Sequence, residues 1–269
     1  MKIPYSASII TFGIALFSQL HAMQDQWARD FLSHYSFKGD ELVLHLGCGN
    51  GNITHYISTL VSQNSVYGWD ASRQAIADAK RKYPSRKFEW LSFSNQRPKD
   101  ISVEGLYDIV FSCSLLQDFG HETHQDILKK ISRSLVPGGK MLLVMMQKDL
   151  SEVFTCAEQL SNSEHWAPYF VNFAYTGLTF TMQAYERYLF DAGFEQFYFN
   201  KVVTKEKFKN RKALCAWISE QSEHVRHLKV EDQASFIDRL LAYILEKNPE
   251  NEQQEIELNF SRIEVIAQK

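Results

Sequence analysis

The sequence predicts an α/β protein whose mainly parallel sheet is covered by helices on both faces. From residue 41 to about 147, short apolar runs without a helical period alternate with amphipathic segments. A glycine-rich turn, Gly47-Cys48-Gly49-Asn50-Gly51, separates the first run from the next helical segment. Residues 257–267, after a helical stretch near the end of the chain, are expected to form the closing strand. Strands joined in sequence by helices favour parallel pairing, because a crossover connection covers one face of the sheet.

The elements of the first half follow from these patterns in order. Residues 23–35 carry apolar side chains on one side and are expected to form an entry helix. Helices are also expected to begin at Gly51, to span 72–83, and to include 127–135, because apolar residues recur there at helical spacing. Strands are expected at 41–46, 66–69, 87–91, 107–112 and 141–146. Pro137-Gly138-Gly139 is expected to turn the chain into the last of these strands.

The second half departs from this rhythm. Residues 147–180 are aromatic-rich and expected to be irregular. A helix over 183–192 and a strand over 194–203 precede a helical insert at 205–248, whose basic start is expected to be solvated and could alternatively steer an anion. No repeat or linker divides the chain, so residues 23–269 are expected to form a single domain.

The bulk composition excludes several classes of partner. The chain has 269 residues, 45% of them hydrophobic, and a formal net charge of −3. A slightly acidic protein has no bulk attraction for phosphate backbones, so nucleic acid is not an expected partner. The four cysteines, Cys48, Cys113, Cys156 and Cys215, form no CxxC pair, so neither a metal site nor a redox dithiol is expected.

Residues 1–22 allow two interpretations. Lys2 precedes an apolar stretch from Ala7 to Phe17, and the chain then reaches Ala22, as in a secretory signal with its cleavage site. The stretch is too short for a confident membrane span, so no stable membrane insertion is expected. Alternatively, these residues form an N-terminal helix that packs on the domain as a lid over a ligand.

The glycine-rich turn and Asp70 predict a nucleoside site. Glycines at this place allow a tight turn and close approach of backbone N–H groups to a ligand. Asp70 ends the second expected strand, where its carboxylate can accept hydrogen bonds from both ribose hydroxyls. The alternative is that Asp70 only caps the helix that starts near Ser72. The third glycine is Gly51 and position 52 is Asn52, so the spacing differs from that of dinucleotide-binding turns and disfavours an NAD-dependent oxidoreductase.

A family resemblance extends these motifs to most of the chain. Residues 43–54, 66–72, 107–112, 135–140, 188–194 and 262–269 resemble the motifs of class I S-adenosylmethionine-dependent methyltransferases. The subgroup that is most similar holds trans-aconitate and juvenile-hormone-acid methyltransferases, and the resemblance covers roughly residues 18–269. It implies a Rossmann-like sheet of seven mostly parallel strands with an antiparallel last strand and a helical insert before it. It also implies S-adenosylmethionine as the cofactor, and a substrate-capping role for 147–180.

The resemblance also implies where the site residues lie. The expected cofactor contacts are Gly47, Gly49, Gly51, Asp70, Ala71, Ser92 and Ser112. The expected acceptor contacts are Gln117, Trp166 and Tyr169, with His121 as a further candidate. Two cofactor positions depart from the family pattern, since His45 and Ser92 stand where the family usually carries acids. Gln117-Asp118 likewise replaces the His-Trp that often follows the fourth strand.

The expected function is methyl transfer to a small molecule, at an oxygen and within that a carboxylate. A carboxylate is ionised at neutral pH and therefore needs no general base, and no catalytic residue is assigned. The alternatives are a nitrogen or phenol acceptor, or a catalytically degenerate protein of this fold that acts through binding. A cytoplasmic location is expected, with export through a signal peptide as the alternative. The sequence does not set the oligomeric state, and a monomer is one expectation.

Overall fold

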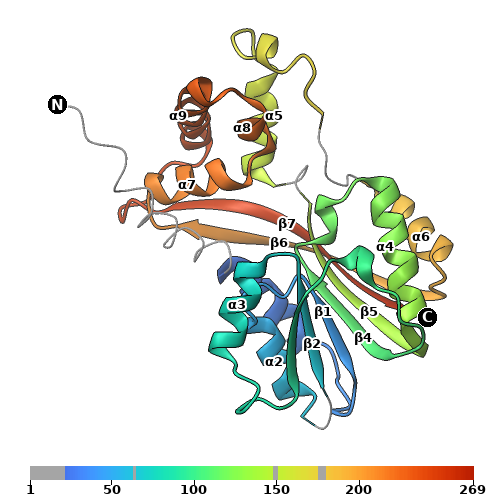
Figure 1. The fold of residues 1–269 in the computed structure, drawn as a ribbon. Coiled ribbons are helices and arrows are strands. Elements are labelled where there is room, and N and C mark those ends of the chain that lie inside the picture. Colours follow the sequence, from blue (N-terminus) through green and yellow to red (C-terminus); the bar gives the residue numbers. More distant parts are fainter. Residues whose placement is uncertain (1–21, 63–64, 148–150, 175–179) are drawn as a thin grey trace. The chain divides into compact units, whose positions relative to one another are not determined.

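The computed structural model describes residues 22–62, 65–147, 151–174 and 180–269 (Figure 1). The expected signal or lid segment therefore lies almost wholly outside the described residues. The first described element is a helix over residues 22–33, which confirms the entry helix. None of the helices in the described ranges is long and apolar enough to cross a membrane.

The sheet has the expected seven strands, in the order β3-β2-β1-β4-β5-β7-β6. Parallel pairs join β1 to β2 and β4, β2 to β3, and β4 to β5. The amide of Gly138, near the start of β5, donates to the carbonyl of Lys269, just after the end of β7, at 3.1 Å. β7 therefore runs antiparallel, as expected. The strands are β1 (Val43–Leu46), β2 (Val66–Asp70), β3 (Leu91–Asn95), β4 (Tyr107–Cys113), β5 (Leu135–Gln147), β6 (Gln196–Phe208) and β7 (Ile256–Gln268).

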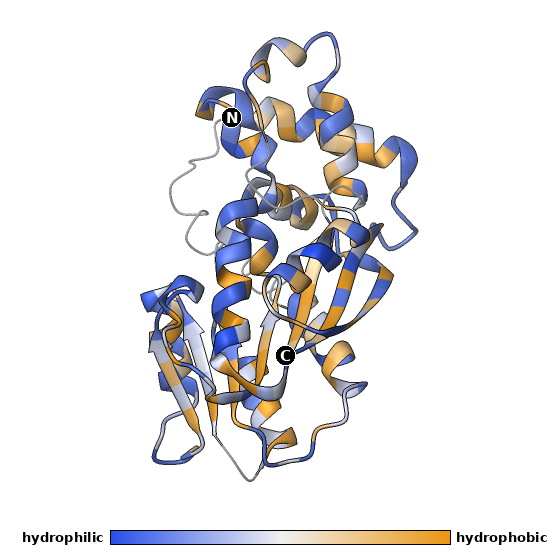
Figure 2. Cartoon of the chain, turned by 90° about the vertical axis from the view of Figure 1, so that its right-hand side faces the viewer, coloured by the Kyte–Doolittle hydropathy of each residue, from blue (hydrophilic) through white to orange (hydrophobic). Residues whose placement is uncertain are grey.

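Helices cover both faces of the sheet. Successive side chains of a strand point to opposite faces, so each strand contacts helices on both sides. Leu44 and Leu46 of β1 join a buried cluster that also holds residues of α4 (His121–Ser134) and α6 (Met182–Asp191). His45, between them, faces the other side and contacts Thr54 of α2 (Asn52–Leu60). The next helix, α3 (Arg73–Lys82), begins where the Ser72 hydroxyl accepts the amide of Ala75. The helices expose a polar side and bury an apolar one (Figure 2).

The chain divides into two compact units. The sheet unit contains residues 24–146, 176–202 and 262–269. The helical unit includes residues 147–175 and 203–261, and holds α5 (Glu152–Ser161), α7 (Arg211–Gln221), α8 (Glu223–His227) and α9 (Val230–Lys247). The expected aromatic segment and the expected helical insert thus belong to the same unit. Its interior is aromatic, with the rings of Trp166 and Phe236 4.9 Å apart.

Four sequence expectations about individual elements are wrong. The third strand is Leu91–Asn95 and not 87–91, because Leu91 and Phe93 are buried whereas Trp90 is exposed. Pro137-Gly138-Gly139 lies inside β5, where the register to β4 shifts between Tyr107 and Ile109, so it forms an irregularity of the strand. Residues 152–161 are helical and not irregular. The basic run from Lys205 begins within β6, which continues to Phe208, so it is not a helix start.

Candidate functional site

The glycine-rich turn after β1 adopts a backbone that favours glycine. Gly47, Gly49 and Gly51 have φ values of 76°, 52° and 82°, in the left-handed region. A Cβ atom on Gly47 would lie 3.0 Å from Leu115, and one on Gly51 would lie 2.8 Å from the ring of Phe93. The turn is held to β2, since the amides of Gly47 and Cys48 both donate to the Trp69 carbonyl, at 2.8 and 3.0 Å.

Asp70 ends β2 beside this turn, as the sequence predicts. One carboxylate oxygen accepts the amide of Gly49 at 2.9 Å, and the other accepts the amide of Ser72 at 2.8 Å. The alternative role of a simple helix cap is wrong, because the side chain that caps α3 is that of Ser72. A carboxylate has about four lone-pair positions, so two remain for ligand hydroxyls.

A cavity of about 340 Å³ opens next to Asp70. Gly47 and Ala71 line it together with Asp70, so three of the expected cofactor positions meet at one cavity. Its other walls are partly apolar and partly basic: Trp69, Gln96, Arg97, Pro98, Lys99, Leu115, Phe119, Thr123 and Ile127. A polar end beside apolar side chains is the arrangement that a nucleoside needs, with the ribose at the carboxylate and the base against the apolar walls.

Ser92 and Ser112 do not line this cavity. Ser92 is the second residue of β3, and its side chain is exposed. Gln96, which follows the end of β3, occupies the position that the incorrect strand boundary gave to Ser92. Ser112 is buried in β4, where its hydroxyl donates to the Leu46 carbonyl at 3.1 Å. The contact expected of Ser92 stays a prediction that its placement does not support.

His45 is enclosed by the fold. Its Nδ1 lies 2.9 Å from the Thr54 hydroxyl, and its ring contacts Phe111. Burial lowers the pKa of His45 to about 3, so this side chain is neutral at physiological pH. It therefore carries no charge at the position where the family pattern has a carboxylate.

The short 3₁₀ helix after β4, Leu116–Asp118 (η2), holds Gln117. Gln117 is 5% exposed, and its Oε1 has no hydrogen-bond partner among the described residues. Nearby, His124 is fixed between the Leu116 carbonyl and the Tyr185 hydroxyl, at 2.8 Å each, and burial lowers its pKa to about 4. His121, the further candidate, lies on the exposed start of α4 and contacts the Tyr188 hydroxyl.

Trp166 and Tyr169 belong to the helical unit, whereas Gln117 belongs to the sheet unit. The ring centroids of Trp166 and Tyr169 lie 5.2 Å apart. Trp166 is buried, and Tyr169 is 43% exposed. Trp166 lines a second cavity, of about 740 Å³, together with residues of α5 and α9. The structure thus brings these two aromatic residues together, in a different unit from the expected cofactor contacts.

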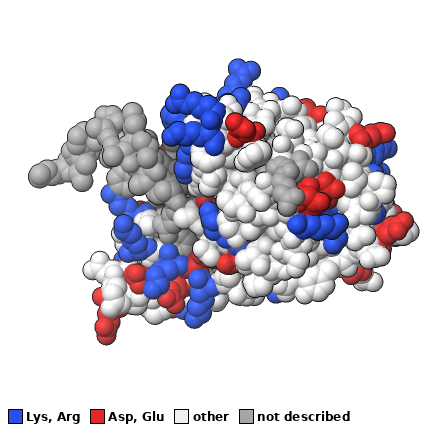
Figure 3. Space-filling model, turned by 90° about the horizontal axis from the view of Figure 1, so that it is seen from below, with Lys and Arg blue, Asp and Glu red and all other residues white. Residues whose placement is uncertain are grey.

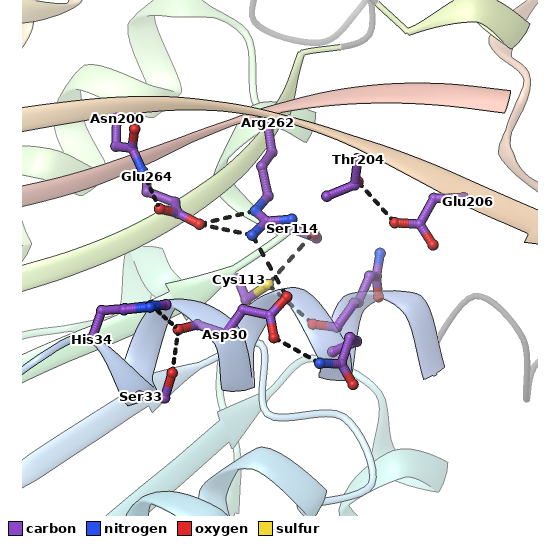
Figure 4. A network of polar contacts seen from close by, with 12 residues as sticks. Asp30, Ser33, His34, Cys113, Ser114, Asn200, Thr204, Glu206, Arg262 and Glu264 are labelled. Carbon is purple, nitrogen blue, oxygen red and sulfur yellow. Dashed lines mark hydrogen bonds and ion pairs between the residues drawn. The ribbon is translucent and has the colours of Figure 1, made fainter.

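Sequence reasoning missed Arg262, which lies in β7 within the sheet unit (Figure 4). Its side chain is 3% exposed and donates from Nε to Glu264 at 3.0 Å. The side chain reaches toward Cys113 and Ser114 at the end of β4, and Ser114 has a φ of 54°, which is uncommon outside glycine. The signal in the sequence was a single basic residue in the closing strand, followed two positions later by the acidic Glu264.

Comparisons with known proteins show sequence similarity to methyltransferases. Residues 44–141 match the family described as a methyltransferase domain. A methyltransferase-like protein, 235L, of Invertebrate iridescent virus 6 is 27% identical over 234 residues, which are 87% of this chain and 85% of that protein. Trans-aconitate 2-methyltransferase of Methylobacterium nodulans is 32% identical over 125 residues, 46% of this chain and 45% of that enzyme. The chain thus aligns with about half the length of that enzyme.

The fold is also found among solved structures. A candidate methyltransferase from Bacillus halodurans C-125 superposes with a TM-score of 0.61 at 14% identity, covering 90% of this chain and 98% of that one. At that identity the likeness concerns the fold alone.

Proposed function

We propose that the chain methylates a carboxylate of a small-molecule acceptor, because it is a class I S-adenosylmethionine-dependent methyltransferase. The observation that carries this proposal is the sequence similarity to trans-aconitate 2-methyltransferases, whose named substrate is a tricarboxylic acid. The expected chemistry agrees, since an ionised carboxylate attacks without a base.

The sheet unit supplies the groups that would hold the cofactor. We propose that Asp70 binds the ribose hydroxyls and that Gly47, Gly49 and Gly51 let the backbone approach the ligand. Gln96, at the end of β3, is a better candidate than Ser92 for the base, because it lines the cavity and carries both a donor and an acceptor. The positive φ values of the three glycines support this assignment, and so do Leu115 and Phe93, which leave no room for a Cβ atom on Gly47 or Gly51.

When bound, the cofactor supplies a methyl group on a sulfonium, which is electrophilic without further activation. The protein's contribution is then to hold the acceptor oxygen in line and to exclude water. The two buried histidines of the sheet unit do not serve as strong bases, because His45 and His124 have pKa values lowered to about 3 and about 4. A carboxylate acceptor does not need a base at these two positions, whereas an amine or a phenol would often need one.

The net charge of −3 and the distribution of charge support a small acceptor. On the face shown in Figure 3, lysine, arginine and acidic side chains lie interspersed among uncharged residues. The slightly acidic net charge gives no bulk attraction for a phosphate backbone, which agrees with a small acceptor.

The test is a methyl-release screen of the purified chain with cofactor that is tritiated in its methyl group. The acceptor panel holds trans-aconitate and other carboxylic acids, phenols and amines. We expect incorporation into carboxylic acids that is released as volatile methanol by mild alkali, since esters hydrolyse whereas methylamines and aryl ethers do not. Alkali-stable label on amines or phenols would contradict the carboxylate proposal but leave the methyltransferase assignment intact.

We further propose that the protein works in the cytoplasm. The free cysteines Cys48, Cys113, Cys156 and Cys215 suit a reducing compartment. Cleavage after Ala22 would leave a chain that begins at Met23, so the position of the mature N-terminus distinguishes the two locations.

A further inference from the structure

Arg262 carries a buried donor group for which the described part of the chain offers no partner. The side chain is 3% exposed, and its Nη1 has no hydrogen-bond partner among the described residues. Buried polar atoms in native proteins are nearly always hydrogen-bonded, and each exception calls for an explanation. A guanidinium with one free nitrogen is a group that a planar anion can approach.

The rest of the guanidinium is held from one side. Nε and Nη2 lie 3.0 and 2.9 Å from the same oxygen of Glu264, and the other Glu264 oxygen accepts from Asn200 at 2.9 Å. Asp30 adds a weaker ion pair at 3.9 Å, and the Trp27 ring lies 5.4 Å away. This chain of contacts, drawn in Figure 4, fixes the orientation of Arg262 but uses only Nε and Nη2, so Nη1 has no hydrogen-bond partner among the residues that the structure describes.

Arg262 lies near the carboxyl edge of the parallel strands, where the ligand is expected to bind. Its charge acts on Cys113, the last residue of β4, so the guanidinium lies near the carboxyl end of that strand. β4 pairs with β1 so that Leu46 lies opposite Ser112, which places the glycine turn and Ser114 at the same carboxyl edge. The sheet order reverses between β1 and β4, and ligands of open α/β sheets bind at such a switch point.

We propose that Arg262 binds a carboxylate of the methyl acceptor through Nη1, with Glu264 and Asn200 as positioning residues. This inference rests on the proposed function and adds the residue that selects an anionic acceptor. The methionine carboxylate of the cofactor has the same chemistry, and the test separates these two sources.

The experiment uses the full chain and compares Arg262→Gln/Glu264→Gln with the wild type. The double change removes both charges of the pair, so no buried charge is left alone. Arg262→Lys keeps the charge but loses the planar fork. Arg187→Gln, at an arginine that is 84% exposed in α6, is the matched control. Calorimetry measures S-adenosylhomocysteine binding first, and then the binding of trans-aconitate, succinate, benzoate or decanoate to the protein saturated with S-adenosylhomocysteine.

We expect at least one of these acids to bind the wild type, and to bind the folded double variant roughly 10- to 150-fold more weakly. S-adenosylhomocysteine affinity should stay unchanged, Arg262→Lys should be intermediate, and Arg187→Gln should behave as the wild type. Equal acid binding by the double variant, or no acid bound by a wild type that binds S-adenosylhomocysteine, would overturn the inference. A selective loss of S-adenosylhomocysteine affinity would overturn the acceptor role and assign Arg262 to the cofactor carboxylate. If the wild type does not bind S-adenosylhomocysteine, the proposed function itself fails.

Discussion

The carboxylate of Asp70, at the end of β2, accepts the amide of Gly49 in the turn after β1 at 2.9 Å. The same carboxylate also accepts the amide of Ser72, the residue that caps the start of α3. One side chain thus ties together two backbone segments that line the proposed cofactor site. Any change at Asp70 therefore affects both the shape of the turn and the groups offered to a ligand.

Asp70→Ala should weaken binding of S-adenosylhomocysteine. Losing charged hydrogen bonds to the ribose hydroxyls costs about 1.5–3 kcal/mol, which is roughly 10- to 150-fold in affinity. Calorimetry on the folded variant measures this change. Asp78→Ala, on α3 and away from the cavity lining, is the control. Unchanged affinity in Asp70→Ala would leave Asp70 with a purely structural role.

S-adenosylhomocysteine should raise the thermal midpoint of the wild type. At a hundredfold excess over its dissociation constant, a ligand adds about 2.7 kcal/mol to the stability of the folded state. In a chain of this size that is roughly 5–10 °C. Differential scanning fluorimetry gives the shift, with NAD as the comparison ligand. A folded protein that responds to NAD and not to S-adenosylhomocysteine would contradict the cofactor assignment.

Gly51→Ala should be clearly more destabilising than Gly105→Ala. Both glycines have positive φ values, 82° and 55°, so both variants carry the backbone cost of about 1 kcal/mol. At Gly51 the new methyl also meets the Phe93 ring at 2.8 Å, whereas at Gly105 no heavy atom lies within 4 Å. Overpacking adds about 1–3 kcal/mol to the loss at Gly51. Urea unfolding of the two variants measures the difference, and equal losses would show that Phe93 moves aside freely.

His45 should make the protein sensitive to acid. The folded pKa is about 3 against a reference value of 6.5, so below pH 6.5 the unfolded state binds a proton that the folded state does not. The associated stability is complete above pH 6.5 and is lost as the pH falls toward 3. Between about pH 7.5 and about pH 5.5, the protonation of His45 in the unfolded state lowers the free energy of unfolding by about 1.4 kcal/mol.

His45→Asn keeps a polar group near Thr54 and removes this titration. Urea unfolding at the two pH values should therefore show a smaller loss in His45→Asn than in the wild type. A wild-type loss that survives in His45→Asn would show that other groups control the acid response.

Mass spectrometry of the protein from its native cell should find an uncleaved N-terminus in the cytosolic fraction. Two observations support this prediction: the cysteines are unpaired, and the cofactor S-adenosylmethionine is made and used in the cytosol. A terminus at Met23 in an exported fraction would contradict the cytoplasmic proposal. A terminus at Met23 in the cytosol would place the start codon there.

Local patterns predicted most elements of the first half of the fold. The glycine turn and Asp70 each follow a strand that its own residues predict, and the parallel pairing of those two strands brings Asp70 beside the turn. The third strand was misplaced because Phe88 and Trp90 look like core residues, although Trp90 is 52% exposed. The alternation of Leu91, Ser92, Phe93 and Ser94 was the better indicator, since its apolar members are the buried ones.

Arg262 could not be assigned from sequence for a different reason. Its charge is balanced by Glu264, which is near in sequence, but also by Asp30, more than two hundred positions away. Whether a basic residue in a strand is paired, exposed or left with a free nitrogen depends on such distant contacts. The cap role of Asp70 was likewise decided only when Ser72 proved to cap α3.

The ring of Phe93 has a consequence for how this sequence can evolve. A Cβ on Gly51 or on Gly68 would meet the same ring, at 2.8 and 2.7 Å. One aromatic side chain therefore restricts two glycine positions on different elements at once. Among homologues, a side chain larger than glycine at position 68 should co-occur with a smaller residue at position 93. Position 51 should remain glycine even then, because its φ of 82° disfavours a side chain whatever space is available.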